Sequence, residues 1–435
     1  MPKFKSQPTP PTPQMYQPQQ TQNQVHSLGL PFTPLGMPKG IPDIPVVRYE
    51  RPQSSPTPPL AMPGSNLKRA INYYADYGGC GFWRMVWPET LMNGYQKAII
   101  NGLTTMVLDP RFYQGVDAVR LQRQATPIQL EFVKFLKQGA AQHDFKIIYE
   151  IDDVVFKDDI PMYNRCRDAF DDPKIVDSIL QMMGMSDELS VTCEYMKEYY
   201  REKSGNKKVS VLPNYAPRFW MDGFYDKKII AENWDKNKNR PRIGYCGSGT
   251  HIDVLNRTGQ RDDFSGVVKQ IISSRKDFKW VMMGAYPLHL KPLVDSGEIE
   301  FIPWSMIYDY PKSIHDLNLQ AVIAPLEDNT FNRAKSNIKF LESACLGIPG
   351  TFQNLCTYKD APLRFDSGDE MLDQLKMLSK DQGYHMKISK DSRAYAETMW
   401  LEDHLDEYHE LYFTPYGSSE RKALLRMNPE QREII

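Results

Sequence analysis

Short apolar runs rich in branched residues alternate with helix-like segments from residue 64 onward. The helical pattern over Pro127–Gly139 carries a broad apolar stripe, which is typical of a helix lying on a sheet. Alternation of this kind favours a parallel sheet covered by helices. In this first region we expect strands at Thr104–Leu108, Lys146–Ile151, Leu189–Thr192 and Lys208–Leu212.

A second alternating set follows a polar, charge-rich stretch over residues 222–240. We expect strands at Arg242–Tyr245, Trp280–Met283, Ile299–Ile302 and Ala321–Ala324, and helices at Phe264–Ser274 and Ile338–Leu346. Ser389–Tyr412 is expected to form one long helix. The pattern predicts an α/β protein with two facing Rossmann-like domains, 64–225 and 241–385, joined by a linker at 226–240. A helix at 386–413 would return to the first domain, followed by a charged tail at 414–435.

Composition changes the picture mainly at the amino-terminal end. Almost half of the 33 prolines lie in residues 1–63, mixed with Gln, Thr and Ser, which predicts a disordered arm that either docks a partner or is simply solvated. A net charge of −1 over 435 residues argues against a generally basic nucleic-acid coat. The chain shows neither a secretory signal nor a run apolar enough for a membrane helix. Six scattered cysteines without a CxxC pair indicate reduced thiols in a cytoplasmic setting and no zinc site.

A glycine-rich loop follows the first strand of the chain. Gly78, Gly79 and Gly81 would let the backbone approach a ligand closely, with Arg84 just beyond them. The full GxGxxG spacing and its partner carboxylate are missing, which disfavours a nicotinamide dinucleotide site. A tight turn with no ligand explains the glycines almost as well.

Two other loops would stand at the carboxyl ends of strands, where open α/β sheets bind ligands. Asp152 and Asp153 could supply a general base or hold sugar hydroxyls, although capping a turn is the ordinary use of such residues. Gly247 and Ser248 offer small residues for phosphate approach. His251, close to them, is equally consistent with a structural histidine.

The most informative segment begins near residue 331 and leads into a predicted helix. Lys335, Ser336 and Lys339 bring two cations and a hydroxyl to the start of that helix, where free amides also favour an anion. Glu342 follows Lys335 by about two turns and lies on the same face, where a carboxylate suits a ribose diol. An ordinary amphipathic helix with solvated lysines is the alternative interpretation.

With these residues taken together, the chain resembles the GT-B glycosyltransferases of the broad group 1, nucleotide-sugar-dependent kind. The resemblance covers roughly residues 70–412. The segment from Asn332 to Pro349 resembles the donor-binding helix of that family and its Gly-x-Pro turn. Leu189–Thr192 with Tyr195–Lys197, and Val211–Asn214, resemble the family's helix entry and its strand end before the linker. Arg242–His251 resembles the first strand and loop of the donor domain.

The resemblance implies roles for these residues. Lys335, Ser336 and Lys339 would hold the diphosphate of a UDP or GDP sugar, Glu342 the ribose, and Gly247 and Ser248 the phosphates, while Trp304 would flank the base. Asp152, Asp153 and the Gly79–Gly81 loop would face the acceptor and the transferred sugar. The lysines would neutralise the leaving diphosphate, so neither a metal nor a further cofactor is implied. The chain departs from the family's Glu-x7-Glu pattern, because Ala334 stands eight residues before Glu342.

The acceptor stays open at this stage. A glycan or envelope component is one candidate, and a hydroxymethylated DNA base, as for phage-encoded relatives working in the host cytoplasm, is another. Arg111, Arg120, Arg123, Lys134 and Lys137 could line a basic groove for DNA, or could belong to a solvated surface. The rival hypothesis is a catalytically inactive nucleotide-binding protein that docks a partner through its amino-terminal arm.

Overall fold

The computed structural model describes residues 66–414 and contains two six-stranded parallel sheets. The predicted arm at 1–63 and all but the first residue of the predicted tail lie outside the described residues. The first sheet consists of β1 (Arg69–Tyr73), β2 (Ile99–Leu103), β3 (Ala118–Gln122), β4 (Lys146–Glu150), β5 (Glu188–Val191) and β6 (Val209–Val211). The second consists of β7 (Arg242–Cys246), β8 (Lys279–Met283), β9 (Glu300–Ile302), β10 (Ala321–Ala324), β11 (Gly350–Gln353) and β12 (Arg364–Phe365).

The order of the strands determines where each sheet can bind a ligand. The first sheet runs β2-β1-β3-β4-β5-β6 and the second β12-β11-β10-β7-β8-β9, every pair being parallel. Chain connections leave in opposite directions from β1 and β3 in the first sheet, and from β7 and β10 in the second. Loops diverge at such points and leave room outside the carboxyl ends of the strands. Each sheet therefore has one preferred place for a site.

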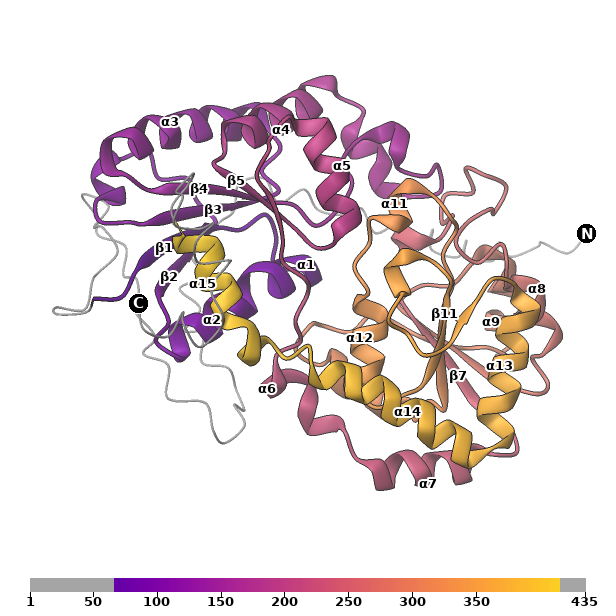
Figure 1. Ribbon diagram of the computed structural model, residues 1–435. Helices are drawn as coiled ribbons and strands as arrows, with labels where there is room; N and C mark the ends of the chain where they lie inside the picture. Colours follow the sequence, from indigo (N-terminus) through magenta and orange to yellow (C-terminus); the bar gives the residue numbers. More distant parts are fainter. Residues whose placement is uncertain (1–65, 415–435) are drawn as a thin grey trace, which may run out of the picture.

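Helices cover both faces of each sheet (Figure 1). In the first domain, α3, α4 and α5 lie on one face, while α2 and α15 lie on the other. Helix α3 begins at a capping box in which Thr126 and Gln129 satisfy each other's backbone amides. The bounds are α1 (Gly79–Gly81), α2 (Trp87–Gly94), α3 (Pro127–His143), α4 (Pro173–Met185), α5 (Glu194–Ser204), α6 (Arg218–Met221), α7 (Lys227–Asn237) and α8 (Val268–Ser273). The remaining helices are α9 (Lys291–Asp295), α10 (Tyr310–Asp316), α11 (Thr330–Arg333), α12 (Ile338–Cys345), α13 (Gly368–Lys380), α14 (Gln382–Glu397) and α15 (Leu405–Phe413).

Two sequence-based expectations about elements were wrong, namely one strand of the first domain and the long terminal helix. The strand expected at Thr104–Leu108 lies one segment earlier, because the chain leaves the sheet after Leu103 and Leu108 is 66% exposed. Most of the expected linker is helix α7, which contacts α14.

The expected long terminal helix is interrupted between α14 and α15. At the interruption the chain forms an isolated parallel bridge between Ala216 and Trp400. Helix α14 lies along the second domain and α15 lies on the first, so the interruption is where the chain passes from one domain to the other (Figure 1).

A buried polar network ties α15 to the first sheet. Glu150, at the end of β4, forms ion pairs with Arg84 at 2.6 Å and with Arg120, and all three side chains are fully buried. Arg120 also lies over the rings of Tyr408 and Tyr412 in α15, at 5.9 and 5.6 Å from the ring centres. Burial on its own would raise the pKa of Glu150, but the two guanidinium groups hold that pKa below its usual range. The Glu150 carboxylate therefore provides the counter-charge that lowers the cost of burying the Arg84 and Arg120 guanidinium groups.

We expect Glu150→Gln to lower the free energy of unfolding by about 3–5 kcal/mol, because two guanidinium groups would stay buried without a counter-charge. The matched control is Glu131→Gln on α3, whose ion pair with Lys134 is solvent-exposed and should be worth less than about 1 kcal/mol. Urea unfolding followed by circular dichroism measures both. Equal losses in the two variants would contradict the role given to Glu150.

Candidate functional site

Loops from both sheets meet at one place, which we call the domain junction. It comprises residues 74–84, 123 and 152–163 of the first domain, and residues 247–263, 302–310 and 325–342 of the second. Direct contacts join the two sides, including an ion pair between Lys335 and Asp153, and hydrogen bonds of Tyr163 with Asp263 and of Asn214 with Ser336. Both switch points lie here, so the junction is the candidate site.

Lys335 lies in the bend between α11 and α12 and reaches across the junction. Its Nζ stands 2.8 and 2.9 Å from the two carboxylate oxygens of Asp153, and 4.0 Å from the centre of the Phe331 ring. Lys335 and Asp153 are partly exposed, with 20% and 28% of their side-chain surface accessible. The pair brings together two residues that the sequence assigned to opposite halves of the reaction.

Ser336 connects the junction to the buried network beneath it. Its hydroxyl accepts a hydrogen bond of 2.9 Å from Asn214 Nδ2. The side-chain oxygen of the same residue, Asn214 Oδ1, accepts a hydrogen bond of 2.9 Å from Arg84 Nη1. The sequence suggested that Arg84 faces a ligand, but the structure shows that it does not. Its side chain is fully buried because it is the partner of Glu150, so it positions Asn214 and Ser336 from below.

Lys339 and His251 form the second part of the site. Lys339 Nζ lies 3.2 Å from His251 Nε2, and His251 Nδ1 lies 2.7 Å from Asp263 Oδ2. Burial, assisted by Lys339, lowers the pKa of His251 to about 4. The imidazole is thus neutral at pH 7, donating from Nδ1 to Asp263 and accepting from Lys339 at Nε2. His251 accordingly acts as a structural histidine that holds a lysine.

Asp263 is the hub of this part of the junction. Besides His251, its carboxylate accepts hydrogen bonds from Tyr163 at 2.6 Å, from Asn332 at 2.6 Å and from the amide of Glu327 at 2.9 Å. Tyr163 belongs to the first domain, whereas the other donors belong to the second. One carboxylate thus fixes the segment before Lys335 and holds the two domains together.

Glu342 lies one helical turn beyond Lys339 and next to an aromatic pair. Tyr310 donates a hydrogen bond of 2.9 Å to its carboxylate. Burial raises the pKa of Glu342 to about 7, which Tyr310 and Lys339 offset only in part. Burial also lowers the pKa of Lys339 to about 8, although Glu342 acts in the opposite direction. Both groups therefore stay sensitive to any charge placed beside them.

Trp304 provides an exposed ring beside this pair. Its side chain is 55% exposed, and its ring centre lies 5.7 Å from that of Tyr310, tilted by 32°. Gly284 allows this placement, because its φ is +88° and a Cβ there would lie 2.4 Å from the Trp304 ring. The arrangement presents a flat apolar face close to the Glu342 carboxylate.

Gly247 and Ser248 follow β7 at the switch point, as the sequence suggested. The amide of Gly247 donates to the carbonyl oxygen of Met283 at 3.1 Å, and the Ser248 hydroxyl lies 2.7 Å from that of Thr250. Gly247 is thus fixed by a backbone hydrogen bond to β8. Of these two residues, only Ser248 has a polar side chain that could contact a phosphate.

The glycine loop is organised by a carboxylate of its own chain. Asp76 Oδ1 accepts hydrogen bonds from the amides of Gly78 at 2.7 Å and Gly81 at 3.2 Å. A Cβ on Gly81 would lie 2.0 Å from the Asp76 carbonyl oxygen, so only glycine fits there. The suggested anion cradle is therefore filled by Asp76, while Gly79 stays open to solvent.

Asp152 lies between this loop and β3. Its carboxylate stands 3.3 Å from Arg123 Nε, and the Cys80 thiol donates to it. Burial alone would raise the pKa of Asp152, but Arg123 and Cys80 bring that pKa below its ordinary value. Asp152 is therefore a held negative charge and a weak base, whereas Asp153 is the carboxylate that meets the second domain.

Ala334 stands eight residues before Glu342, where the resemblance noted from the sequence would place a glutamate. It is only 1% exposed and packs into the apolar cluster of the first domain, and its carbonyl oxygen lies 3.6 Å from Cys193 Sγ. A carboxylate at this position would be buried among apolar side chains without a partner. The substitution thus fits the way the α11–α12 segment docks on the first domain.

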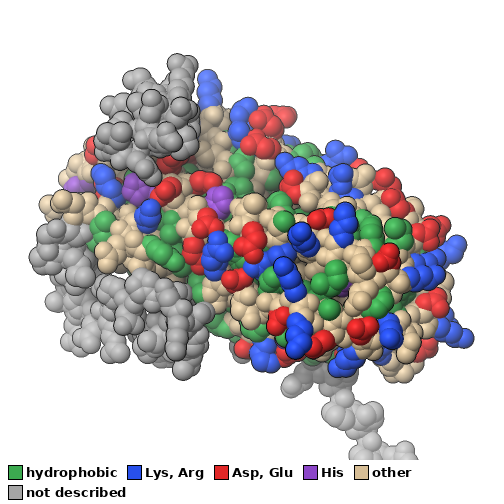
Figure 2. Space-filling view, turned by 60° about the horizontal axis from the view of Figure 1, so that its bottom comes forward, with side chains coloured by type: hydrophobic (Ala, Val, Ile, Leu, Met, Phe, Trp, Pro, Cys, Tyr) green, Lys and Arg blue, Asp and Glu red, His purple; other side chains and the backbone are tan. Residues whose placement is uncertain are grey.

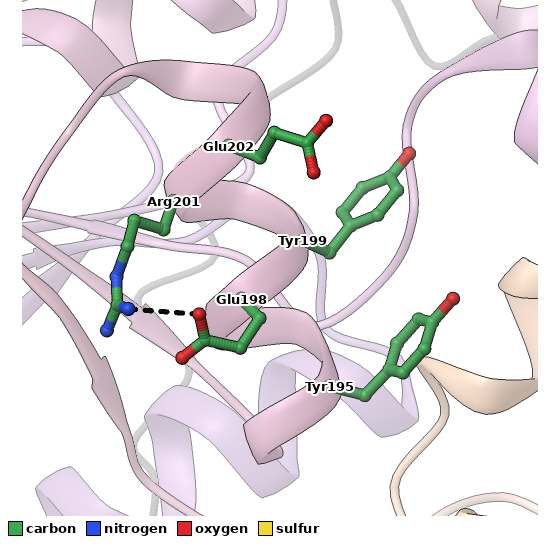
Figure 3. A pocket seen from close by; sticks show the side chains of 5 residues that line it. All are labelled: Tyr195, Glu198, Tyr199, Arg201 and Glu202. Atoms are coloured by element: carbon green, nitrogen blue, oxygen red, sulfur yellow. Dashed lines mark hydrogen bonds and ion pairs between the residues drawn. The ribbon is translucent and has the colours of Figure 1, made fainter.

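A surface depression of about 540 Å³ lies along α5, whose Tyr199 donates a hydrogen bond to Asp159 of the junction. Its described lining consists of Tyr195, Glu198, Tyr199, Arg201 and Glu202. Figure 3 shows the two tyrosines projecting to one side of the helix and Arg201 to the other, paired with Glu198. Lining from a single helix gives no converging set of groups, so we assign no chemistry to it.

Two features are missing from residues 66–414. No group of three or more His, Cys, Asp or Glu side chains in this range is arranged to hold a metal ion. No helix there combines the length and the apolar character needed to cross a bilayer.

Comparison with known proteins supports the architecture. The sequence matches no protein-family model and no curated protein significantly. Among solved structures, it is similar to WaaG, a glycosyltransferase involved in lipopolysaccharide biosynthesis, with 12% identity and a TM-score of 0.50 over 80% of this chain and 100% of WaaG. It is also similar to HepE from Anabaena in complex with UDP, with 8% identity and a TM-score of 0.52 over 83% of this chain and 100% of HepE. The expected GT-B architecture of two facing Rossmann-like domains is therefore confirmed.

Sequence reasoning missed three residues of the junction. Tyr163, Asp263 and Tyr310 carry hydrogen bonds that hold the segments around Lys335 and Glu342. A buried tyrosine needs a partner for its hydroxyl, but nothing in the spacing of Tyr163 pointed to a carboxylate 100 residues away.

We expect His251→Gln to remove a pH dependence of stability. The unfolded histidine titrates near 6.5 and the folded one near 4, so the unfolded state binds more protons between these values. The wild-type protein therefore loses stability from this group as the pH falls through that window, by at most about 1.4 kcal/mol per pH unit. The variant should be less stable at pH 7, and the gap should narrow towards pH 4. Urea unfolding at several pH values tests this, and parallel profiles would contradict it.

Proposed function

We propose that the chain transfers a glycosyl group from a nucleoside-diphosphate sugar to an acceptor hydroxyl. The observation that carries the proposal is the meeting of Lys335, Ser336, Lys339 and Glu342 at the switch point of the second sheet, across from Asp153. Two cations, a hydroxyl and a ribose-binding carboxylate beside an exposed ring are what a nucleoside diphosphate requires. HepE, whose fold is similar, has been solved with UDP, with UDP and glucose, and with UDP-glucose.

In this proposal the donor enters with its base on Trp304 and its ribose hydroxyls on Glu342. The diphosphate lies against Lys339, Ser336 and Lys335, near Ser248. Lys335 now pairs with Asp153, so the incoming phosphate replaces one carboxylate as its partner. The exchange keeps the lysine neutralised before and after binding, which limits the cost of leaving a charge unpaired.

The same exchange frees Asp153 beside the reacting centre. Its carboxylate can then accept the proton of the acceptor hydroxyl, as a general base does. The lysines compensate the charge that develops on the leaving diphosphate, and in this scheme they do so in place of a metal ion. Asp152, held by Arg123, keeps the glycine loop in position and carries no proton.

The inactive-protein alternative predicts donor binding without transfer. Ala334 was the residue that raised it, but the burial of that position explains the missing glutamate by packing. The Lys335–Asp153 pair retains a cation and a candidate base at the junction. Transfer from a nucleotide sugar is therefore the function that these contacts support best.

We expect Lys335→Met to reduce transfer or donor hydrolysis by roughly 10²–10³-fold, with UDP affinity changing much less, because the charge acts mainly on the leaving group. The release of UDP from UDP-sugars, measured with and without EDTA, is the assay. Lys134→Met, an exposed lysine on α3, is the control. Wild-type turnover in Lys335→Met would exclude the assigned role, and loss of activity in EDTA would show that a metal ion contributes.

Glu342→Gln should weaken UDP binding by about 10–100-fold, since hydrogen bonds to a charged group are worth about 1.5–3 kcal/mol. Isothermal titration with UDP and with uracil separates the ribose contact from base stacking. The control Glu410→Gln changes a carboxylate on α15, in the first domain. Unchanged UDP affinity in Glu342→Gln would refute the ribose contact.

A further inference from the structure

A row of exposed, largely aromatic side chains borders the junction on both domains. We call it the aromatic rim: Tyr77 from the glycine loop of the first domain, and Trp304, Met306 and Tyr308 from the loop after β9. Their exposed fractions are 57%, 55%, 70% and 47%. Large apolar side chains that gather on a surface while remaining exposed mark a place where something binds.

Ring contacts position the two tyrosines of the rim. The Tyr308 ring lies edge-on to Phe82 and Trp87 of the first domain, at 5.2 and 6.1 Å between centres, and Tyr77 lies edge-on to Tyr74 at 5.4 Å. Burial and the neighbouring Tyr77 hydroxyl raise the pKa of Tyr308 to about 12, so both phenols stay protonated at neutral pH. The remaining ring faces are thus fixed before any ligand arrives, which limits the entropy lost on binding.

The two segments that form the rim contain no basic residue. Residues 73–83 and 301–310 hold aromatic side chains, glycines and two aspartates, without a lysine or arginine. Arg123, which enters this region from β3, is ion-paired with Asp76 and Asp152. Nucleic acids require cations along their phosphates, so the rim suits an uncharged ligand.

The charge visible on one face of the molecule is also mixed. Figure 2 shows lysine and arginine side chains intermingled with aspartate and glutamate over the face it displays, without a continuous basic stripe on that face. Several basic residues suggested for a DNA groove have other partners. Arg120 is buried with Glu150, while Arg111, Lys134 and Lys137 pair with Asp109, Glu131 and Asp187.

We propose that Tyr77 and Tyr308, the part of the aromatic rim beyond the base-stacking Trp304, bind the acceptor, and that the acceptor is an uncharged saccharide stacked on their rings. A sugar ring offers an apolar C–H face to an aromatic ring, and its hydroxyls meet the phenol groups and the aspartates around them. The rim belongs to loops that also carry partners of both sides of the site. Tyr308 shares its loop with Tyr310, the partner of Glu342, and Tyr77 shares its loop with Cys80, the partner of Asp152. This inference rests on the proposed function and names its acceptor class.

The test measures acceptor and donor binding separately on the full chain. An array of uncharged mono- and oligosaccharides is probed in the presence of UDP, and single-stranded DNA with and without 5-hydroxymethylcytosine is titrated in parallel. Variants are Tyr77→Ala and Tyr308→Ala, with Tyr77→Phe and Tyr308→Phe as ring-preserving partners. Tyr95→Ala, an exposed tyrosine at the end of α2, is the matched control.

We expect the wild-type protein to bind at least one saccharide, each alanine variant to lose about tenfold or more in that affinity, and the phenylalanine variants to lose no more than about threefold. UDP affinity should stay within about twofold in every variant. UDP binding without any saccharide binding, or saccharide binding that ignores the alanine changes, would overturn the rim proposal alone. DNA binding that the alanine changes abolish would replace the saccharide with a nucleobase. Absence of binding to both UDP and GDP in the wild-type protein would overturn the proposed function itself.

Discussion

The junction depends on one buried carboxylate, Glu150, held between two guanidinium groups. One partner of this carboxylate, Arg120, packs against two tyrosine rings of α15. The other partner, Arg84, donates a hydrogen bond to Asn214, which in turn donates one to Ser336. A buried cation without a counter-charge is costly, so each arginine can remain only where the carboxylate is. The returning helix and the donor-side loop are therefore positioned by the same charge.

Above this network, the site is assembled from side chains that already neutralise each other. Lys335 forms an ion pair with Asp153. Lys339 forms a hydrogen bond with the neutral His251, whose other ring nitrogen is hydrogen-bonded to Asp263. If the proposed function holds, such a site is pre-organised for a diphosphate, because the cations are fixed and their partners can be exchanged for phosphate oxygens. The intermediate pKa values of Lys339 and Glu342 reflect burial in a place where a charged ligand would change both.

Apolar packing also joins the two domains at the junction. One continuous hydrophobic cluster runs from Trp83 and Trp87 through Trp220 to Tyr310 and Phe340. Phe331 and Ala334 of the second domain belong to the cluster of the first. The burial of Ala334 agrees with the absence of a glutamate at that position, and Asp153 brings a carboxylate to Lys335 from the opposite domain.

The sequence by itself determined what is local. Branched apolar runs specified β4, β7, β8 and β10 to within a residue or two, and the spacing of Lys335, Lys339 and Glu342 placed all three around one short helix. Only the tertiary structure decided which residues face one another. Lys335 and Asp153 are 182 positions apart, Tyr163 and Asp263 are 100 apart, and Arg84 and Glu150 are 66 apart. Period and propensity extend over a few residues, whereas these pairs are selected by burial and by the need to satisfy each charge once the sheets have met.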